Sequence, residues 1–207
     1  MARVLFCFKL DYSYTMIDIF KKISSIKPKV KDITFVAIDG RGGSGKSTLA
    51  KLLSEKLNAE IIRTDDFATW NNTFDWWTSL VEKVFEPITR GEKTVSYQPT
   101  SWWKDHHPKA VTNQPVSKIM ILEGVSSSRE EFEKYISFRI FVDTPKDICL
   151  LRGVERDVGD GKDKEELTIL WKKWLGEEDI YLNRYNPKEK ANLVINGTEP
   201  FAEQISL

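Results

Sequence analysis

Residues 40–47 combine residue types and spacing that suit the binding of phosphate groups. The run Gly-Arg-Gly-Gly-Ser-Gly-Lys-Ser fits the pattern G-x-x-x-x-G-K-[ST]. Glycines allow backbone N–H groups to turn toward phosphate oxygens, and the N-terminus of a following helix adds the positive end of its dipole. In such a loop Lys46 would reach the β- and γ-phosphates, and the Ser47 hydroxyl would hold Mg²⁺. The motif therefore predicts a triphosphate site formed by Gly40, Arg41, Gly42, Gly43, Ser44, Gly45, Lys46, Ser47 and Thr48.

The same glycines admit a second interpretation. Gly40, Gly42 and Gly45 also fit the dinucleotide pattern G-x-G-x-x-G, and Asp65 follows about 20 residues later, as that fold requires. A dinucleotide site has no need of a lysine and a serine after the last glycine, whereas a triphosphate site needs both. A turn without a ligand would not need them before an amphipathic helix either. The Lys-Ser pair therefore favours the triphosphate interpretation.

The segments around the motif follow in the order that a phosphate-binding loop requires. Residues 33–38 are an apolar run of strand length, and leucines at helical spacing continue to Leu57. Amphipathic helices are predicted for residues 15–26 and for an apolar stripe within residues 167–175, which we interpret as core. Further apolar runs typical of buried strands occupy residues 59–63, 118–122, 136–142 and 191–195. Strands alternating with helices predict an α/β domain.

Acidic residues near the ends of two of these predicted strands, 59–63 and 118–122, could take part in catalysis. In a doubly wound sheet, ligands bind at the carboxyl ends of the strands. Asp65 would stand near the phosphate loop, where a carboxylate could accept the proton of an acceptor hydroxyl as a general base. The alternative is that Asp65 or Asp66 only caps the next helix. Glu123 could hold Mg²⁺ directly or through water.

A pair of arginines follows the strand predicted for residues 136–142. Arg152 and Arg156 lie four residues apart and so share one face of a helix. Around a transferring phosphoryl group they would stabilise the charge of the equatorial oxygens. The alternative is a solvated face with an Arg156–Asp157 pair that contributes little. Residues 158–163 have the composition expected at the tip of a closing lid.

Residues 68–115 contain five of the seven tryptophans. Such a density of aromatic rings could line a pocket for a ring-bearing substrate, or it could form the core of an inserted lobe. A helix is predicted near residues 80–85, and we expect Pro87 to end it or to bend its last turn. The pair His106-His107 lacks the spacing of zinc ligands.

Composition narrows the class of protein further. The 207 residues suffice for one domain with a lid or an insertion, and 31 basic residues balance 31 acidic ones. A net charge of zero gives no general attraction to nucleic acid or to an anionic membrane. No apolar run approaches membrane-spanning length, and the first residues do not resemble a signal peptide. The two cysteines form no close pair, so we expect a reduced, cytoplasmic setting.

Taken together, the motifs resemble the uridine kinase-like branch of the P-loop nucleoside and nucleotide kinases. The stretches that carry this resemblance are IDGRGGSGKSTLA (38–50), TDDF (64–67), ILEGV (121–125), DTP (143–145), RGVERD (152–157) and YNPKEKANLVING (185–197). The aspartate that the family places soon after a substrate-side tyrosine is absent, because residues 98–101 read Gln-Pro-Thr-Ser.

The resemblance implies a P-loop NTPase fold of three α/β/α layers, with a five-stranded parallel sheet, a small lid and an aromatic-rich inserted substrate lobe. Residues 1–207 would form a single domain with an N-terminal helix and linker (1–32), a substrate-side insertion (68–115) and a lid (152–165). It also implies ATP and Mg²⁺ as cofactors. The implied catalytic residues are Asp65, Lys46, Arg152 and Arg156, the metal residues are Ser47 and Glu123, and the substrate residues are Asp65, Phe67, Tyr97, Trp102 and Glu123.

The resulting prediction is ATP-dependent phosphoryl transfer to a hydroxyl of a small metabolite, with uridine or cytidine as the leading acceptor. Other small alcohols, such as pantothenate or a sugar, are an alternative, and so is a non-catalytic ATP-binding regulatory module. A GTP switch is disfavoured because the chain has no N-K-x-D motif. A dehydrogenase would be recognised by binding of NAD(P)H. We expect a small-molecule partner, and neither nucleic acid nor membrane.

Overall fold

The computed structural model describes residues 16–69, 72, 75–100, 110–158 and 163–204. Its centre is a five-stranded sheet in the order β2-β5-β1-β6-β7, in which every neighbouring pair is parallel. The strands are β1 (Thr34–Gly40), β2 (Glu60–Arg63), β5 (Ile119–Glu123), β6 (Ile136–Asp143) and β7 (Leu193–Asn196). The predicted α/β fold with a five-stranded parallel sheet is therefore confirmed.

This strand order excludes the dinucleotide interpretation of the glycine loop. In the classic dinucleotide-binding fold, the strand that follows the first helix lies directly beside the first strand. Here β5 separates β1 from β2, because β5 pairs with both of them. The loop between β1 and α2 (Lys46–Leu57) therefore belongs to a different topology.

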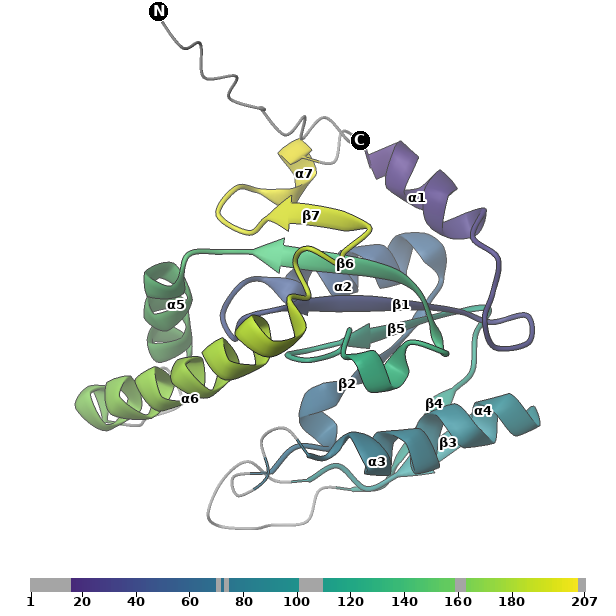
Figure 1. Cartoon of the computed structure of the whole chain (residues 1–207), viewed down its shortest axis with the longest axis horizontal. Helices are drawn as coiled ribbons and strands as arrows, with labels where there is room; N and C mark the ends of the chain where they lie inside the picture. The colour runs from purple at the N-terminus through teal and green to yellow at the C-terminus, as the bar shows by residue number, and fades with distance from the viewer. Residues whose placement is uncertain (1–15, 70–71, 73–74, 101–109, 159–162, 205–207) are drawn as a thin grey trace, which may run out of the picture.

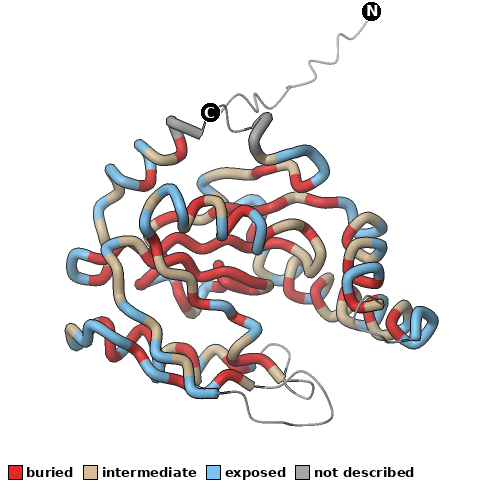
Figure 2. The backbone as a smooth tube through the Cα atoms, turned by 180° about the vertical axis from the view of Figure 1, so that it is seen from behind, coloured by how far each residue is buried: buried red, intermediate tan, exposed pale blue. Residues whose placement is uncertain are grey.

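Helical layers cover both faces of the sheet because its side chains alternate in direction. Phe35 and Ala37 of β1 pack with the helical segment around Leu80 and Phe85, whereas Val36 and Ile38 pack with α1 (Met16–Ser24) and α2. All seven residues of β1 are buried. Figure 2 shows that the buried backbone is concentrated in these central strands. The three-layer arrangement follows from this burial on both faces.

Two long helices lie at the carboxyl ends of the strands. They are α5 (Lys146–Val158) and α6 (Lys164–Tyr185), and they pack on each other through Cys149, Val154, Leu167, Trp171 and Leu175. In Figure 1 both helices lie at the edge toward which the arrowheads of β5, β6 and β7 point. They are therefore placed to form one wall of any site at that edge. A short helix, α7 (Phe201–Gln204), ends the described chain.

The segment between β2 and β5 starts with a 3₁₀ turn, Thr64–Asp66, and then becomes helical. Farther along, α3 (Trp77–Leu80), a π turn (Val81–Phe85) and α4 (Glu86–Arg90) follow one another without a break. Of the two alternatives for Pro87, the one in which it ends the helix is wrong, since α4 continues to Arg90 and ends at Gly91, whose φ is 104°. That Pro87 bends the last turn stays a prediction. The wider π turn relieves the clash that a proline ring makes with the carbonyl four residues earlier in a regular α-helix.

A small antiparallel sheet within this segment was not predicted from the sequence. It pairs β3 (Thr94–Tyr97) with β4 (Thr112–Pro115). Strand β4 contains no large apolar residue, and so it gave no hydrophobic pattern to detect. The side-chain amide of Gln114 donates a hydrogen bond of 2.5 Å to Glu60, which fastens β4 to the edge of the main sheet.

None of the helices in the described ranges combines the length and the apolar character that crossing a membrane requires. The predicted lid tip, the His106-His107 pair and Trp102 lie wholly or in part outside the described residues.

Candidate functional site

The loop between β1 and α2 has the backbone of a phosphate cradle. Gly43 has a φ of 77°, and Gly45, the residue before the first turn of α2, has a φ of 103°. A Cβ atom on Gly43 would lie 2.4 Å from the carbonyl oxygen of Cys149, so only glycine fits there. The first N–H groups of α2 have no partner within the helix, and so they are available to a ligand at the loop. This geometry fits a bound polyphosphate.

Lys46 closes this loop from within. Its side chain is buried, and its ammonium group donates a hydrogen bond of 2.7 Å to the carbonyl oxygen of Arg41. Both Lys46 and Ser47 line a cavity of about 360 Å³. A buried ammonium group facing a cavity of this kind is suited to an anionic ligand.

The structure brings the two predicted metal residues together. The Ser47 hydroxyl donates a hydrogen bond of 3.1 Å to the Glu123 carboxylate. Burial raises the pKa of the Glu123 carboxyl, and the nearby Lys46 opposes that shift. Mg²⁺ commonly takes one or two protein oxygens and completes its coordination with phosphate oxygens and water. One hydroxyl and one carboxylate beside a phosphate cradle fit that donor set.

Asp65 lines the same cavity as Lys46 and Ser47. It lies in the 3₁₀ turn that follows β2, and the residue that precedes this turn is Arg63. Asp65 therefore does not precede a helix as an N-cap, which was the alternative interpretation. An exposed carboxylate that lines the same cavity as the Lys46 ammonium group is suited to act as a general base for phosphoryl transfer.

The side chains of the two predicted arginines lie in different surroundings. Arg156 lines the cavity, and its guanidinium lies 2.9 Å from the Asp157 carboxylate and 5.4 Å from the ring centroid of Trp171. Arg152 instead donates a hydrogen bond of 2.8 Å to the carbonyl oxygen of Gly197, after β7. Four residues advance a helix by about 6 Å, which is enough for two long side chains on one face to reach different surroundings. The predicted catalytic role of Arg152 stays a prediction.

Phe67 and Tyr97 are buried. Their rings pack at a centroid distance of 4.8 Å, and the Tyr97 hydroxyl donates a hydrogen bond of 3.3 Å to Asp66. Within the described residues neither belongs to the cavity wall, whereas Trp76 does. Trp76 is also part of the core of this segment. The aromatic group thus supplies both core and wall, and the contact of Phe67 and Tyr97 with a substrate stays a prediction.

Sequence reasoning missed the contribution of α6. The stripe interpreted as core does bury Leu167, Trp171 and Leu175, but Trp171 and Trp174 also line the cavity. The indole N–H of Trp171 donates a hydrogen bond of 2.9 Å to Asp157. A detectable signal was present, because Glu178 continues the stripe seven residues after Trp171. A carboxylate at that position on an apolar face requires a partner.

That partner is the phosphate loop itself. The Glu178 carboxylate accepts a hydrogen bond of 3.0 Å from the backbone N–H of Gly42. Glu178 is only 7% exposed. Burial raises the pKa of this carboxyl to about 7, Asp65 adds to the shift, and Lys46 opposes it. Glu178 therefore titrates near neutral pH within the cavity wall.

Asp39, immediately before the loop, was also missed. It is fully buried at the end of β1 and accepts hydrogen bonds from Gly40 N–H (2.7 Å), Ser126 N–H (3.1 Å), Ser128 N–H (3.0 Å), the Ser128 hydroxyl (2.5 Å) and the Tyr181 hydroxyl (2.6 Å). This carboxylate joins the start of the phosphate loop, the segment after β5 and helix α6. It therefore holds in place the three pieces of chain that surround Lys46.

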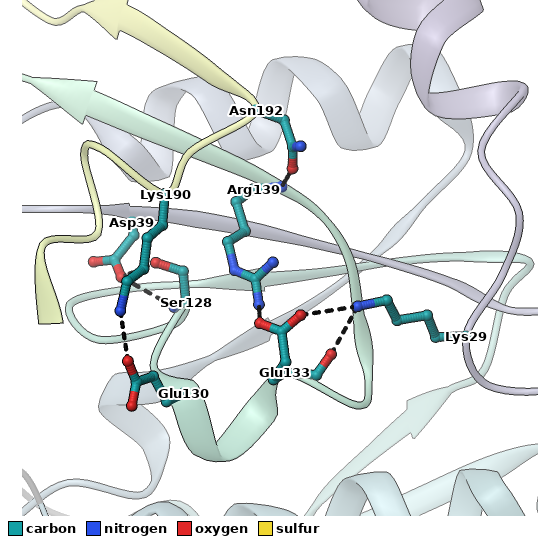
Figure 3. Close-up of polar contacts among 8 residues, drawn as sticks. All are labelled: Lys29, Asp39, Ser128, Glu130, Glu133, Arg139, Lys190 and Asn192. Atoms are coloured by element: carbon teal, nitrogen blue, oxygen red, sulfur yellow. Dashed lines mark hydrogen bonds and ion pairs between the residues drawn. The ribbon is translucent and has the colours of Figure 1, made fainter.

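Ion pairs at the surface support the same segment after β5. Figure 3 shows Asp39 beside Ser128, and farther along the chain Lys190 paired with Glu130 at 2.5 Å. Glu133, near the end of the segment, pairs with Lys29 at 3.2 Å and with Arg139. The start of the segment is thus held by the buried Asp39 carboxylate, and its end is held by ion pairs at the surface.

We expect Gly153→Ala to destabilise the protein by about 1–3 kcal/mol, because overpacking forces side chains from their preferred positions. A Cβ atom at Gly153 would lie 2.5 Å from the Trp171 ring. Urea unfolding would measure the loss. The matched control is Gly176→Ala on α6, where a Cβ atom meets nothing within 4 Å, so stability should stay equal or rise. Equal effects of both substitutions would contradict the close packing of Trp171.

The β1–loop–α2 unit, the strand order and the cavity define the class as a P-loop kinase fold. A solved structure of a possible uridine kinase from Bacillus stearothermophilus matches this fold with a TM-score of 0.64, covering 87% of this chain and 97% of that one at 20% identity. No family model matches the chain.

Curated relatives indicate which P-loop kinases the chain is similar to in sequence. A uridine kinase of Schizosaccharomyces pombe is 28% identical over 168 residues, 69% of this chain, which spans 36% of that relative's length. A uridine kinase of Mannheimia succiniciproducens is 27% identical over 183 residues, covering 77% of this chain and 84% of the relative. Sequence and fold together support the uridine kinase-like branch of the P-loop kinases for this chain.

Proposed function

We propose that this protein is an ATP-dependent kinase that transfers a phosphoryl group to a hydroxyl of a small ring-bearing metabolite. The leading acceptor is a nucleoside of the uridine or cytidine type, because the similar curated relatives are named uridine kinases. The observation that carries the proposal is that Lys46, Ser47 and Asp65 line the same cavity.

In this proposal the residues of the site have separate roles. Lys46 and the loop N–H groups bind the phosphates, and Ser47 with Glu123 holds Mg²⁺. Asp65 orients the acceptor hydroxyl and accepts its proton. Bound ATP with Mg²⁺ supplies the phosphoryl group. A cytoplasmic location, where ATP and Mg²⁺ are abundant, is part of the proposal.

The cavity wall supports roles for α5 and α6. Arg156 lines the cavity, and in this proposal it stabilises the negative charge that develops there. Arg152 is instead placed to hold the chain after β7 through Gly197. The indoles of Trp76, Trp171 and Trp174 offer flat apolar surfaces for the ring of an acceptor. An aromatic wall beside a general base supports a ring-bearing alcohol as the acceptor.

The test is a screen of the purified full chain with ATP, Mg²⁺ and a panel of nucleosides, sugars and pantothenate. We expect ADP formation above the acceptor-free rate with at least one nucleoside, and mass spectrometry should find the phosphorylated nucleoside. Transfer to a sugar or to pantothenate alone would show that the acceptor is not a nucleoside, and it would leave the proposed phosphoryl transfer standing. Tight ATP binding with no transfer to any acceptor would contradict the kinase proposal and favour a regulatory module.

A further inference from the structure

The Glu178 carboxylate occupies a backbone N–H group of the loop that is proposed to bind phosphate. One carboxylate oxygen accepts the Gly42 N–H at 3.0 Å. The other oxygen, Oε2, is buried and has no hydrogen-bond partner within the described structure. A buried ionised carboxylate with one unpaired oxygen is costly. The ionised form is therefore poorly compensated at this position.

The contact between α6 and the loop is closely packed. A Cβ atom on Gly42 would lie 3.0 Å from the Glu178 carboxylate and 3.0 Å from the Trp171 ring. The Glu178 side chain therefore stays on the Gly42 N–H unless α6 moves. Its negative charge can be removed in place by protonation.

The charged and titratable groups around Glu178 come from every neighbouring element. Lys46 and Arg41 of the loop favour its ionised form, whereas Asp65 of the 3₁₀ turn opposes it. The thiol of Cys149 faces it from α5, and burial raises the pKa of that thiol to about 11. On α6 itself, Glu177 lines the same cavity, and Asp179 is paired with Arg41 and Lys146 at 2.5 Å each. Lys46 is thus the main cation that both Glu178 and a bound phosphate would share.

On the basis of the proposed function, we propose that Glu178 is a proton-carrying positioning residue of the nucleotide site. Its carboxyl group takes one proton from solvent when the terminal phosphate of ATP is bound beside Lys46. It returns that proton to solvent when the phosphate has left. In the protonated form Glu178 adds no like charge to the phosphate and can donate a hydrogen bond.

The physical reason is the repulsion of like charges in a confined cavity. Lys46 and Glu178 line one cavity, so a phosphate held by Lys46 lies near the Glu178 carboxylate. Two anions that share one cation cannot both remain ionised without cost. The raised pKa of Glu178 in the unliganded protein, about 7, means that little is needed to protonate it. ADP lacks the terminal phosphate, so its binding should favour protonation of Glu178 less than the binding of ATP does.

The test measures dissociation constants by calorimetry for Mg²⁺ complexes of a non-hydrolysable ATP analogue and of ADP, at pH 6.5 and pH 8.5. Relative to Glu178→Gln at each pH, the wild-type affinity for the ATP analogue should fall roughly 20-fold between these pH values. The ADP affinity should change less than about threefold. Calorimetry in buffers of different ionisation enthalpy should show uptake of up to one proton with the ATP analogue, and Glu178→Gln should lose that uptake.

Glu177→Gln is the matched control. It removes the same charge from the same cavity one residue earlier, but it does not touch the Gly42 N–H. We expect Glu177→Gln to keep the pH dependence of the wild type. Equal pH dependence in the wild type and Glu178→Gln, with both binding the analogue, would overturn the role of Glu178 and leave the kinase proposal standing. No binding of the analogue by any variant at either pH would overturn both.

Discussion

Asp65→Asn should lower kcat by about 10²–10⁴-fold and leave the affinity for ATP within about threefold of the wild type. Asparagine keeps the shape of the side chain and cannot accept the acceptor's proton. Because Asp65 lines the cavity from the turn after β2 and is not part of the phosphate loop, its loss should affect the chemical step and not the binding of ATP. Steady-state kinetics with saturating acceptor, together with calorimetric ATP binding, would separate the two effects.

The control for this substitution is Asp66→Asn, the next residue in the same turn. Asp66 accepts a hydrogen bond from Tyr97, and it does not belong to the described cavity wall. Its loss should lower kcat less than about tenfold, since no proton transfer depends on it. If Asp65→Asn turned over as fast as Asp66→Asn, Asp65 would not be the base.

The second large effect is expected on stability. Asp39→Ala should lower the free energy of unfolding by about 3–5 kcal/mol, because it leaves several buried donors without an acceptor. Urea unfolding followed by circular dichroism would measure the change. Asp143→Asn at the end of the neighbouring strand β6 is the matched control. Its carboxylate is half exposed and pairs with Lys188 at 2.7 Å, so it should cost less than about 1 kcal/mol.

Milder substitutions keep this prediction testable if Asp39→Ala does not fold. Ser128→Ala and Tyr181→Phe each remove one donor to Asp39. Each should cost about 1 kcal/mol, the net value of one hydrogen bond. Stability unchanged in both would contradict a structural role for this carboxylate.

The sheet could be predicted from the sequence because its strands are short apolar runs buried on both faces, as the burial of all of β1 shows. Lys46, Ser47 and Glu123 were predictable because loop chemistry and strand ends determine their positions. The separate directions of Arg152 and Arg156 were not, since spacing on a helix fixes a face and not the reach of a long side chain.

Other features depended on contacts between distant parts of the chain. The bond from Gly42 to Glu178 joins residues 136 positions apart, and no local pattern encodes it. Asp39 appeared to be an ordinary residue before a glycine loop, and only the packed structure shows the donors that surround it. The π turn before Pro87 was likewise not predictable, because proline usually marks the start or the end of a helix and here the helical segment continues through it.

The Trp171 ring lies against two glycines from different elements, Gly42 in the phosphate loop and Gly153 on α5. It therefore sets the distance between the glycine loop and the cavity wall formed by α5 and α6. In the proposed kinase, a substitution of residue 171 that changes the affinity for the acceptor should also change the affinity for ATP. The two binding constants cannot be tuned separately at this position.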